Sequence, residues 1–176
     1  VQTCALPIYV KEVVIVECGT AFRILRALMG RLPFRVSSIV EVIHRYLKEG
    51  KIRVKEGAVS DAVTYHDPCQ LGRNGGVFEE PREVIRKIVT DYREMSPTRG
   101  QNWCCGGGGG LVALDNEEFR IKSGKPKKEQ IVATGAKIVV TACENCVSQL
   151  KTIQSGYGLD VEVKYLTELV CENLDV

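Results

Sequence analysis

The sequence predicts an α/β fold made of two related units, each a small, mostly parallel sheet flanked by helices. Short runs of β-branched residues alternate along the chain with longer stretches of helical periodicity, which is typical of strand–helix repeats. An internal repeat is also present, because the run VVIVEC that ends at Cys18 matches the run IVVTAC that ends at Cys143. We therefore expect the last part of one repeat over residues 9–57 and one complete repeat over residues 58–176.

The composition is that of a globular protein without an extended nucleic-acid interface. Of the 176 residues, 44% are hydrophobic and 26% are charged, and the formal net charge is +2. No apolar run approaches the roughly 20 residues that a membrane-spanning helix needs. Residues 1–8 have neither a strand nor a helix period and match the translation of a common sequencing adapter. We expect this segment, with Cys4, to be non-native.

The first unit is predicted to alternate strand and helix twice. Its strands are short and β-branched, and its helices carry apolar residues at helical spacing. Lys51–Gly57 is charged and is expected to form a loop or an edge hairpin. The predicted elements are a strand over 13–16, a helix with Phe22, Leu25 and Leu28 on one face, a strand over 34–37 and a helix over about 39–48 that Gly50 ends.

The second unit is predicted to repeat the same alternation over a longer stretch. Asp115 or Asn116 is suited to cap the start of a helix. Gly124 and Pro126 are expected to interrupt this helix, and Gly135 is expected to end its continuation. The other predicted elements are a strand over 62–65, a helix near Pro81 that buries Val84, Ile85, Ile88, Val89 and Tyr92, a strand over 138–140, a helix over 145–154, a strand over 161–165 and a helix over 167–173.

Five of the eight cysteines fall in the complete unit and indicate a metal site. They follow the spacing C-x(34)-C-C-G-x(36)-C-x-x-C, and each lies after a predicted strand or in a turn, where a parallel sheet presents its ligand crevice. Thiolates gathered in this way are typical of a metal site in a reducing cytoplasm rather than of a secreted disulfide framework. The five candidate ligands are Cys69, Cys104, Cys105, Cys143 and Cys146.

Backbone groups are expected to complete this site. Five consecutive glycines follow the adjacent cysteines, and glycine allows the backbone to approach a bulky group closely because it has no Cβ. We assign Gly106 and Gly107 to that approach. The Cys143–Cys146 motif lies at the start of a predicted helix, where N–H groups and the positive helix end favour thiolates.

In these motifs the sequence resembles the cysteine-rich CCG domain family. That family occurs in heterodisulfide reductase catalytic subunits and in iron–sulfur subunits of glycolate, lactate and anaerobic glycerol-3-phosphate oxidising enzymes. The stretches VIVECGTAFRILRAL, HDPCQLGRNGGVFEEPRE and NWCCGGGGGLVAL are similar to the heterodisulfide-reductase-like K subunits of the membrane redox complex tied to dissimilatory sulfite reduction. The resemblance covers nearly everything after Tyr9.

The resemblance implies a cofactor, a reaction and a set of partners. It implies that the five cysteines hold a 4Fe–4S cluster, which in heterodisulfide reductases is noncubane. It also implies two-electron reduction or formation of a disulfide or trisulfide on a small sulfur-carrier protein. The subunit would act with others in a complex on the inner face of the cell membrane. The first unit is expected to have lost its own site, because Ala21 stands where a second cysteine would follow Cys18.

Two other functions remain open from the sequence. The chain could be an electron-relay subunit that passes electrons from a flavin dehydrogenase towards quinone, since one family includes both kinds of protein. It could also be a zinc-stabilised docking module, although zinc takes four ligands and leaves the fifth thiolate without a role.

Several residues near the cysteines have two interpretations each. His66 could donate a proton to a leaving thiolate, or it could shape the turn that carries Cys69. Cys18 is expected to be a buried side chain, or a residue that lies beside the ligands, rather than a ligand itself. The remaining expectations are that Cys171 lies in the core, that His44 lies at the surface, that Trp103 shields the site from water, and that Lys122, Lys125, Lys127 and Lys128 form a solvated face or dock an acidic partner.

Overall fold

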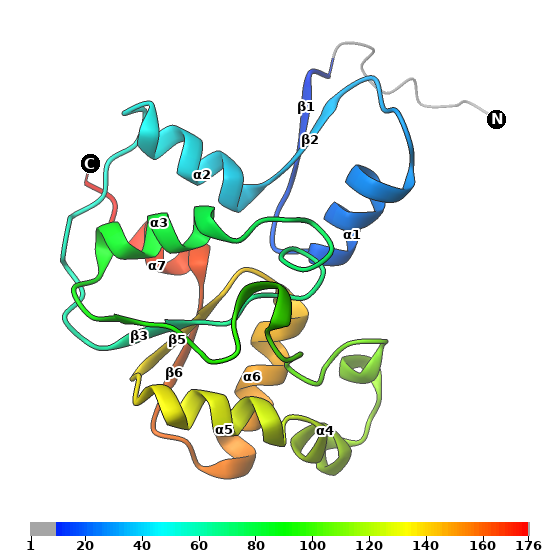
Figure 1. Ribbon diagram of the computed structural model, residues 1–176, viewed down its shortest axis with the longest axis vertical. Coiled ribbons are helices and arrows are strands. Elements are labelled where there is room, and N and C mark those ends of the chain that lie inside the picture. The colour runs from blue at the N-terminus through cyan, green and yellow to red at the C-terminus, as the bar shows by residue number, and fades with distance from the viewer. Residues whose placement is uncertain (1–9, 176) are drawn as a thin grey trace.

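In the computed structural model, which describes residues 10–175, the chain forms two parallel sheets with helices around them (Figure 1). The smaller sheet pairs β1 (Glu12–Ile15) with β2 (Arg35–Ser38). The larger sheet has the strand order β4-β3-β5-β6, and all of its strands are parallel. The predicted α/β class is therefore confirmed. Residues 1–8, which the sequence assigns to a non-native segment, lie outside the described residues.

The first unit has the predicted alternation of strands and helices. A short helix α1 (Gly19–Arg23) continues as a π-helical turn over Ile24–Leu28. Helix α2 (Ile39–Lys48) begins directly after β2, because Ser38 and Glu41 form a capping box. In that box the Glu41 N–H donates to Ser38 Oγ over 3.2 Å, and the Ser38 N–H donates to the Glu41 carboxylate over 2.9 Å.

The larger sheet is covered by helices on both faces. Its central strands β3 and β5 are buried along their whole length, as a parallel sheet between two helix layers requires. Helices α3 and α7 pack on one face with α2, and α5 and α6 pack on the other. The elements of this unit are β3 (Val63–Tyr65), α3 (Glu79–Ile88), β4 (Tyr92–Arg93), α4 (Glu117–Ser123), α5 (Lys125–Thr134), β5 (Ile138–Thr141), α6 (Glu144–Tyr157), β6 (Glu162–Tyr165) and α7 (Leu166–Glu172).

The break between α4 and α5 lies where the sequence predicts it. Asn116 caps α4 by accepting the Phe119 N–H over 2.9 Å, and Gly124 separates α4 from α5. A Cβ at Gly124 would lie 2.4 Å from Cγ1 of Ile153 on α6, so only glycine allows this close packing. Gly135 then ends α5 in the left-handed conformation, with φ of 61°.

Two predictions about this unit are wrong. Tyr92 lies in the short strand β4 beside β3 and not on the helix, because α3 ends at Ile88 and Val89 is already extended. Cys171 is exposed and not in the core, since α7 presents Leu166, Leu169 and Val170 to the sheet and Cys171 points away. Residues 51–57 form a loop in which Val54 makes an isolated antiparallel bridge to Leu174.

The strand order creates a crevice at the carboxyl ends of β3 and β5. The chain leaves β3 through α3 to reach β4 on one side, whereas β5 lies on the other side of β3. Adjacent strands whose connections run in opposite directions leave a gap above the sheet, and ligands of open α/β sheets bind there. The segments that begin with His66 after β3 and with Ala142 after β5 both enter this crevice.

Candidate functional site

The structure brings all five predicted cysteine ligands together around one cavity of about 440 Å³. Cys69 follows β3, Cys104 and Cys105 lie in the loop between η2 (Arg99–Gln101) and η3 (Leu111–Ala113), and Cys143 and Cys146 lie at the start of α6. Cys105, Cys143 and Cys146 form one buried cluster, whereas Cys69 is half-buried and Cys104 is exposed. We call this group the five-cysteine site.

The sulfur atoms of the five-cysteine site form a continuous series of contacts. Sγ of Cys105 lies 3.5 Å from Sγ of Cys146. The thiols of Cys69 and Cys105 are also close enough to Cys104, and that of Cys146 close enough to Cys143, to shift one another's pKa values. Thiolates this close repel one another, so a shared cationic group is what would stabilise all five in ionised form. The residues present therefore fit a thiolate-held metal centre.

Hydrogen bonds favour a thiolate at Cys104. The pKa of the Cys104 thiol is lowered because the thiols of Cys105 and Cys69 and the N–H groups of Gly106 and Gly108 donate to its sulfur. The Gly106 nitrogen lies 3.4 Å from that sulfur. The same contact with Cys104, together with burial, raises the pKa of Cys69, and the contact with Cys104 raises the pKa of Cys105 to about 12. Negative charge in the metal-free site therefore collects first on Cys104.

A second thiolate position lies at the start of α6. The pKa of Cys143 is lowered to about 6, because the Cys146 thiol and the N–H groups of Cys146, Gly19 and Asn145 donate to its sulfur. Cys143 is the N-cap of α6, where the positive end of the helix also favours an anion. The contacts with Cys105 and Cys143, together with burial, raise the pKa of Cys146. The N–H of Gly19 shows that the first unit also contributes to this site.

The glycines after Cys105 approach protein atoms closely. A Cβ at Gly106, which has φ of 90°, would lie 2.7 Å from the Ser123 carbonyl oxygen. A Cβ at Gly107 would lie 2.7 Å from Cγ2 of Val112 and 2.8 Å from Cβ of Gln149. The observed need for glycine at both positions thus comes from packing against α4, η3 and α6. Their contact with a cofactor stays a prediction.

His66 lies beside the five-cysteine site and is completely buried. The Asn102 side-chain amide donates to the Asp67 carbonyl over 2.8 Å and lies 3.3 Å from Nδ1 of His66, which therefore acts as the acceptor. The proton is then on Nε2, which has no hydrogen-bond partner among the described residues. One ring nitrogen lies within 4.8 Å of the sulfurs of Cys105 and Cys146.

The pKa of His66 differs from the near-neutral pKa of a free imidazole. Burial and the nearby charge of Lys127 lower the pKa of His66 well below the usual range. The imidazole is therefore neutral at pH 7. Donation of an imidazolium proton to a leaving thiolate is therefore disfavoured.

A buried arginine fixes the turn that carries Cys69. Both terminal nitrogens of Arg82 on α3 donate to the Asp67 carboxylate over 2.8 Å, and Nε donates to Glu94 over 2.6 Å. The Asp67 carboxylate also accepts the backbone N–H of Arg99 over 3.0 Å. One carboxylate thus connects α3, the Cys69 turn and the loop that leads to Cys104. Sequence reasoning did not identify this contact, since an arginine in a charged helix is usually exposed.

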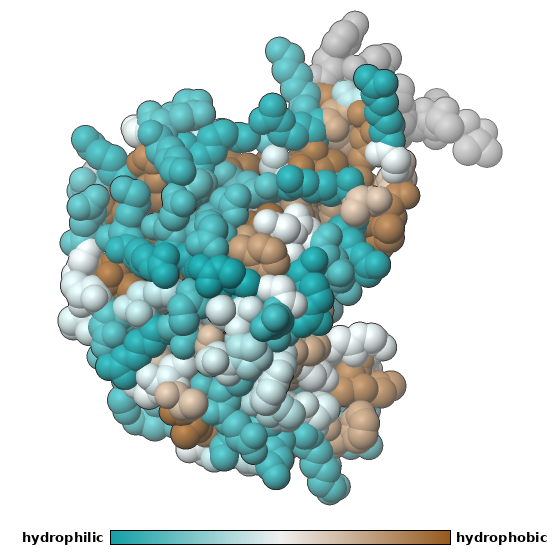
Figure 2. All heavy atoms as spheres, viewed as in Figure 1, coloured by the Kyte–Doolittle hydropathy of each residue, from teal (hydrophilic) through white to brown (hydrophobic). Residues whose placement is uncertain are grey.

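Cys18 borders the same cavity from the first unit. It is exposed, so the first of its two predicted places, a buried position, is wrong, and the second, beside the ligands, stays a prediction. Its sulfur caps α1 by accepting the Ala21 N–H over 3.4 Å. Glu17 has φ of 54°, a left-handed conformation that directs the chain sharply into α1. Figure 2 shows the molecule hollowed at its right edge, between the parts that carry α1 and α4 in Figure 1.

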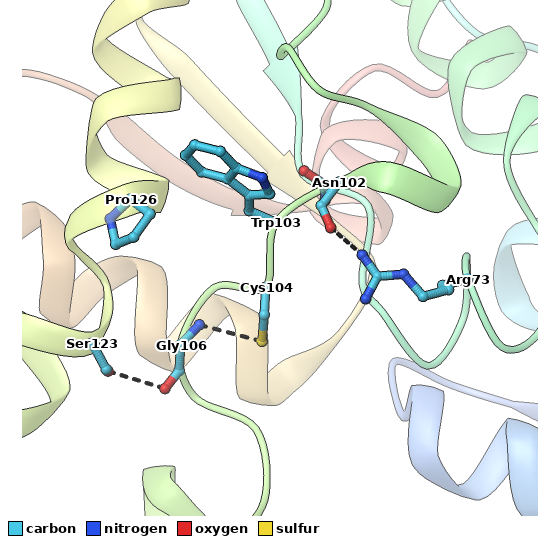
Figure 3. A pocket seen from close by; sticks show the side chains of 7 residues that line it. All are labelled: Arg73, Asn102, Trp103, Cys104, Gly106, Ser123 and Pro126. Carbon is cyan, nitrogen blue, oxygen red and sulfur yellow. Dashed lines mark hydrogen bonds between the residues drawn. The ribbon is translucent and has the colours of Figure 1, made fainter.

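Trp103 borders a second pocket of about 470 Å³, next to the five-cysteine site (Figure 3). Trp103 is 46% exposed, lies beside Pro126 and does not line the five-cysteine cavity, so its expected role as a shield stays a prediction. Cys104 lines both pockets. Arg73 holds the segment before Trp103 by donating to the carbonyls of Gly100, over 2.7 Å, and of Asn102.

The predicted lysine face is only partly correct. Lys122 and Lys125 are exposed and Lys128 is half-buried, whereas Lys127 is completely buried. His44, expected at the surface, is half-buried and contacts the carboxylate of Glu83 over 2.7 Å.

Comparison with known proteins gives consistent matches. The profile of the cysteine-rich domain family (CCG) matches residues 63–151. The D subunit of the dihydromethanophenazine:CoB–CoM heterodisulfide reductase of Methanosarcina mazei is 35% identical over 173 residues, which cover 92% of this chain and 40% of that protein. An Hdr-like menaquinol oxidoreductase iron–sulfur subunit of Archaeoglobus profundus is 27% identical over 75% of this chain and 25% of its own length.

A third relative is the EtfAB:quinone oxidoreductase of Syntrophomonas wolfei, which is 29% identical over 66% of this chain and 17% of its own length. The chain spans about 40% of the length of the heterodisulfide reductase D subunits that it matches. Among the described residues, no helix has both the length and the apolar character needed to span a bilayer. The family profile covers half of the chain and contains all five cysteines, so this chain belongs to the cysteine-rich CCG domain family, with heterodisulfide-reductase-like iron–sulfur subunits among its relatives.

Proposed function

We propose that this chain is the iron–sulfur catalytic part of a heterodisulfide-reductase-like complex and that the five-cysteine site holds a 4Fe–4S cluster. The observation that carries this proposal is the convergence of five thiols at the crevice above β3 and β5. Three of the thiols are buried, while Cys69 and Cys104 lie on the accessible side. The similarity to the D subunit of a heterodisulfide reductase supports an oxidoreductase that acts on sulfur groups.

Each cysteine has a distinct place in this proposal. Cys105, Cys143 and Cys146 would hold the cluster on the protein side, and Cys69 and Cys104 would hold it on the cavity side. A bound cluster, cubane or noncubane, supplies one-electron steps and an iron that can take up sulfur. The chain gathers the thiolates, donates backbone N–H groups to them, and excludes water from the buried side.

The proposed reaction is the reduction, or in reverse the formation, of a disulfide or trisulfide. Reduction of one disulfide breaks an S–S bond, takes up two electrons and two protons, and yields two thiols. We propose a small sulfur-carrier protein as the substrate and other subunits of a complex, on the inner face of the membrane, as the source of electrons. Exposed apolar side chains such as Leu28 and Leu114 are of the kind that protein partners cover.

A second candidate is an electron-relay subunit that passes electrons from a flavin dehydrogenase towards quinone. The similarity to an EtfAB:quinone oxidoreductase favours it. The two functions differ in whether sulfur substrates reach the metal. A change in the EPR spectrum when a thiol or disulfide is added supports the catalytic function, and an unchanged spectrum supports the relay.

The ligand assignment is tested by replacing single cysteines. We expect Cys105→Ser to lose the iron and the EPR signal of the chain purified anaerobically, because Cys105 is in contact with both Cys104 and Cys146. Cys171→Ser is the matched control, since Cys171 is exposed on α7 and does not line the cavity. Unchanged iron content and spectrum in Cys105→Ser contradict the proposal. Zinc without iron in the wild-type chain favours the docking module.

A further inference from the structure

Lys127 is a fully buried lysine beside the five-cysteine site. Its side chain is 0% exposed, on the face of α5 that packs against the sheet. Nζ donates to Oδ1 of Asn102 over 2.7 Å and to Oε1 of Gln130 over 2.5 Å, and it lies 3.7 Å from Sδ of Met95. All three partners are neutral. Within residues 10–175, no carboxylate oxygen forms an ion pair with this ammonium group.

A buried ammonium group without an anion is costly, so a compensating charge is expected nearby. The acidic groups that face Lys127 are Asp67 and the thiols of Cys104, Cys105 and Cys146. Asp67 is already paired with Arg82 over 2.8 Å. The compensating negative charge is therefore expected at the five-cysteine site, when the cysteines hold an anionic centre. Burial lowers the pKa of Lys127 to about 8, while these anions raise it, so the group remains mostly charged at pH 7.

Polar contacts connect Lys127 to His66, which lies beside the sulfurs. Asn102 accepts from Lys127 through Oδ1 and donates through Nδ2 towards Nδ1 of His66. One ring nitrogen of His66 lies within 4.8 Å of the sulfurs of Cys105 and Cys146. Asn102 also comes from the segment that leads to Cys104 (Figure 3). Two side chains, Asn102 and His66, thus link Lys127 to the edge of the five-cysteine site.

We propose that Lys127 supplies a buried positive charge beside the five-cysteine site and that this charge favours reduction of the group that the cysteines hold. Asn102 and His66 are positioning residues between Lys127 and the site. The inference rests on the proposed function, because it requires a redox group at the site. In a region of low dielectric constant, a nearby positive charge favours any added negative charge.

Lys127→Met removes the buried charge. Lys125→Met is the matched control, since it removes the same charge from an exposed position on the same helix. Lys127→Gln replaces Lys127→Met if the latter does not fold.

The inference is tested by potentiometric titration of the chain loaded with iron and sulfide. We expect reduction to be about tenfold less favourable in Lys127→Met, a shift of about 59 mV to more negative potential for one electron. Gln130→Leu, which keeps the charge and removes one acceptor, should retain more of the wild-type potential than Lys127→Met. A Lys127→Met potential equal to that of Lys125→Met contradicts the inference. Wild-type protein that takes up no iron contradicts the proposed function and, with it, this inference, whereas equal potentials in iron-loaded protein contradict the inference alone.

Discussion

Single buried charges decide how firmly the cysteine-bearing turns are held. Arg82 is 0% exposed and is paired with Asp67 and Glu94, so its contacts join α3 to the turn before Cys69. A buried ion pair adds little compared with a well-packed apolar pair, but removal of one partner leaves an unpaired charge. The stability of this turn therefore depends on Arg82 being present.

Arg82→Met is expected to lower the free energy of unfolding by about 3–5 kcal/mol, because the Asp67 carboxylate stays buried without its partner. Urea unfolding of the metal-free chain measures this change. Arg86→Met on the same helix is the control, since the Arg86 side chain is 49% exposed and lies 3.7 Å from Glu94. A loss for Arg82→Met no larger than for the control would show that Asp67 does not depend on this pair.

The same cluster makes stability dependent on acid. Burial alone would raise the pKa of Glu94, but hydrogen bonds from Arg82, Thr98 and Tyr92 and the Arg82 charge lower it. A carboxylate with a lowered folded-state pKa contributes stability above its unfolded pKa of about 4.3, and this contribution is lost as pH falls further. We expect Glu94→Gln to reduce the slope of unfolding free energy against pH below about pH 4.5. Glu129→Gln, at an exposed position, should leave the slope unchanged.

Periodicity predicts most elements of this chain correctly, and the errors have a common cause. The helix after Asn116, its break at Gly124 and its end at Gly135 follow from local residue chemistry. Tyr92 was predicted on the helix because its spacing from Ile85 and Ile88 continues the helical pattern. Strand β4 has only two residues, and its pairing with β3 is a contact between segments far apart in sequence. A local pattern cannot include such a contact.

At the level of elements, the α4–α5 break is a site where a single methyl group matters. Gly124→Ala would place Cβ 2.4 Å from Cγ1 of Ile153, which α6 holds in the core. We expect a loss of about 1–3 kcal/mol in the free energy of unfolding, as overpacking usually produces. Gly100→Ala is the control, because no atom lies within 4 Å of its added Cβ. Thermal unfolding that is equally affected in both variants would contradict the packing argument.

For the whole molecule, the important property is that one cavity has a buried side and an accessible side. Cys104 is exposed and Cys69 is half-buried, whereas the other three cysteines of the site are buried. Backbone and thiol hydrogen bonds also lower the pKa of Cys104. A reagent from solvent therefore meets an accessible thiolate first.

In the metal-free, reduced chain we expect Cys104 to be alkylated at least about tenfold faster than Cys105 or Cys146, because it is both more exposed and more ionised. Peptide mass spectrometry after short exposure to iodoacetamide measures the order. Reconstitution with iron and sulfide should protect the five-cysteine site and leave Cys171 reactive. Reaction of Cys104 after the buried cysteines would contradict this division of the cavity into a buried and an accessible side.

The sequence by itself determined the α/β class, the family and the group of five cysteines that the structure brings together. Strand and helix periods, caps and cysteine spacing are local or directly countable, and parallel strands bring the residues at their carboxyl ends to one edge. Only the tertiary structure decided which polar side chains are buried. Lys127 and Lys125 belong to the same charged run, yet one lies in the core and the other in solvent. Burial depends on which distant segments pack over a side chain, and for Lys127 these are the segments that carry Met95 and Asn102.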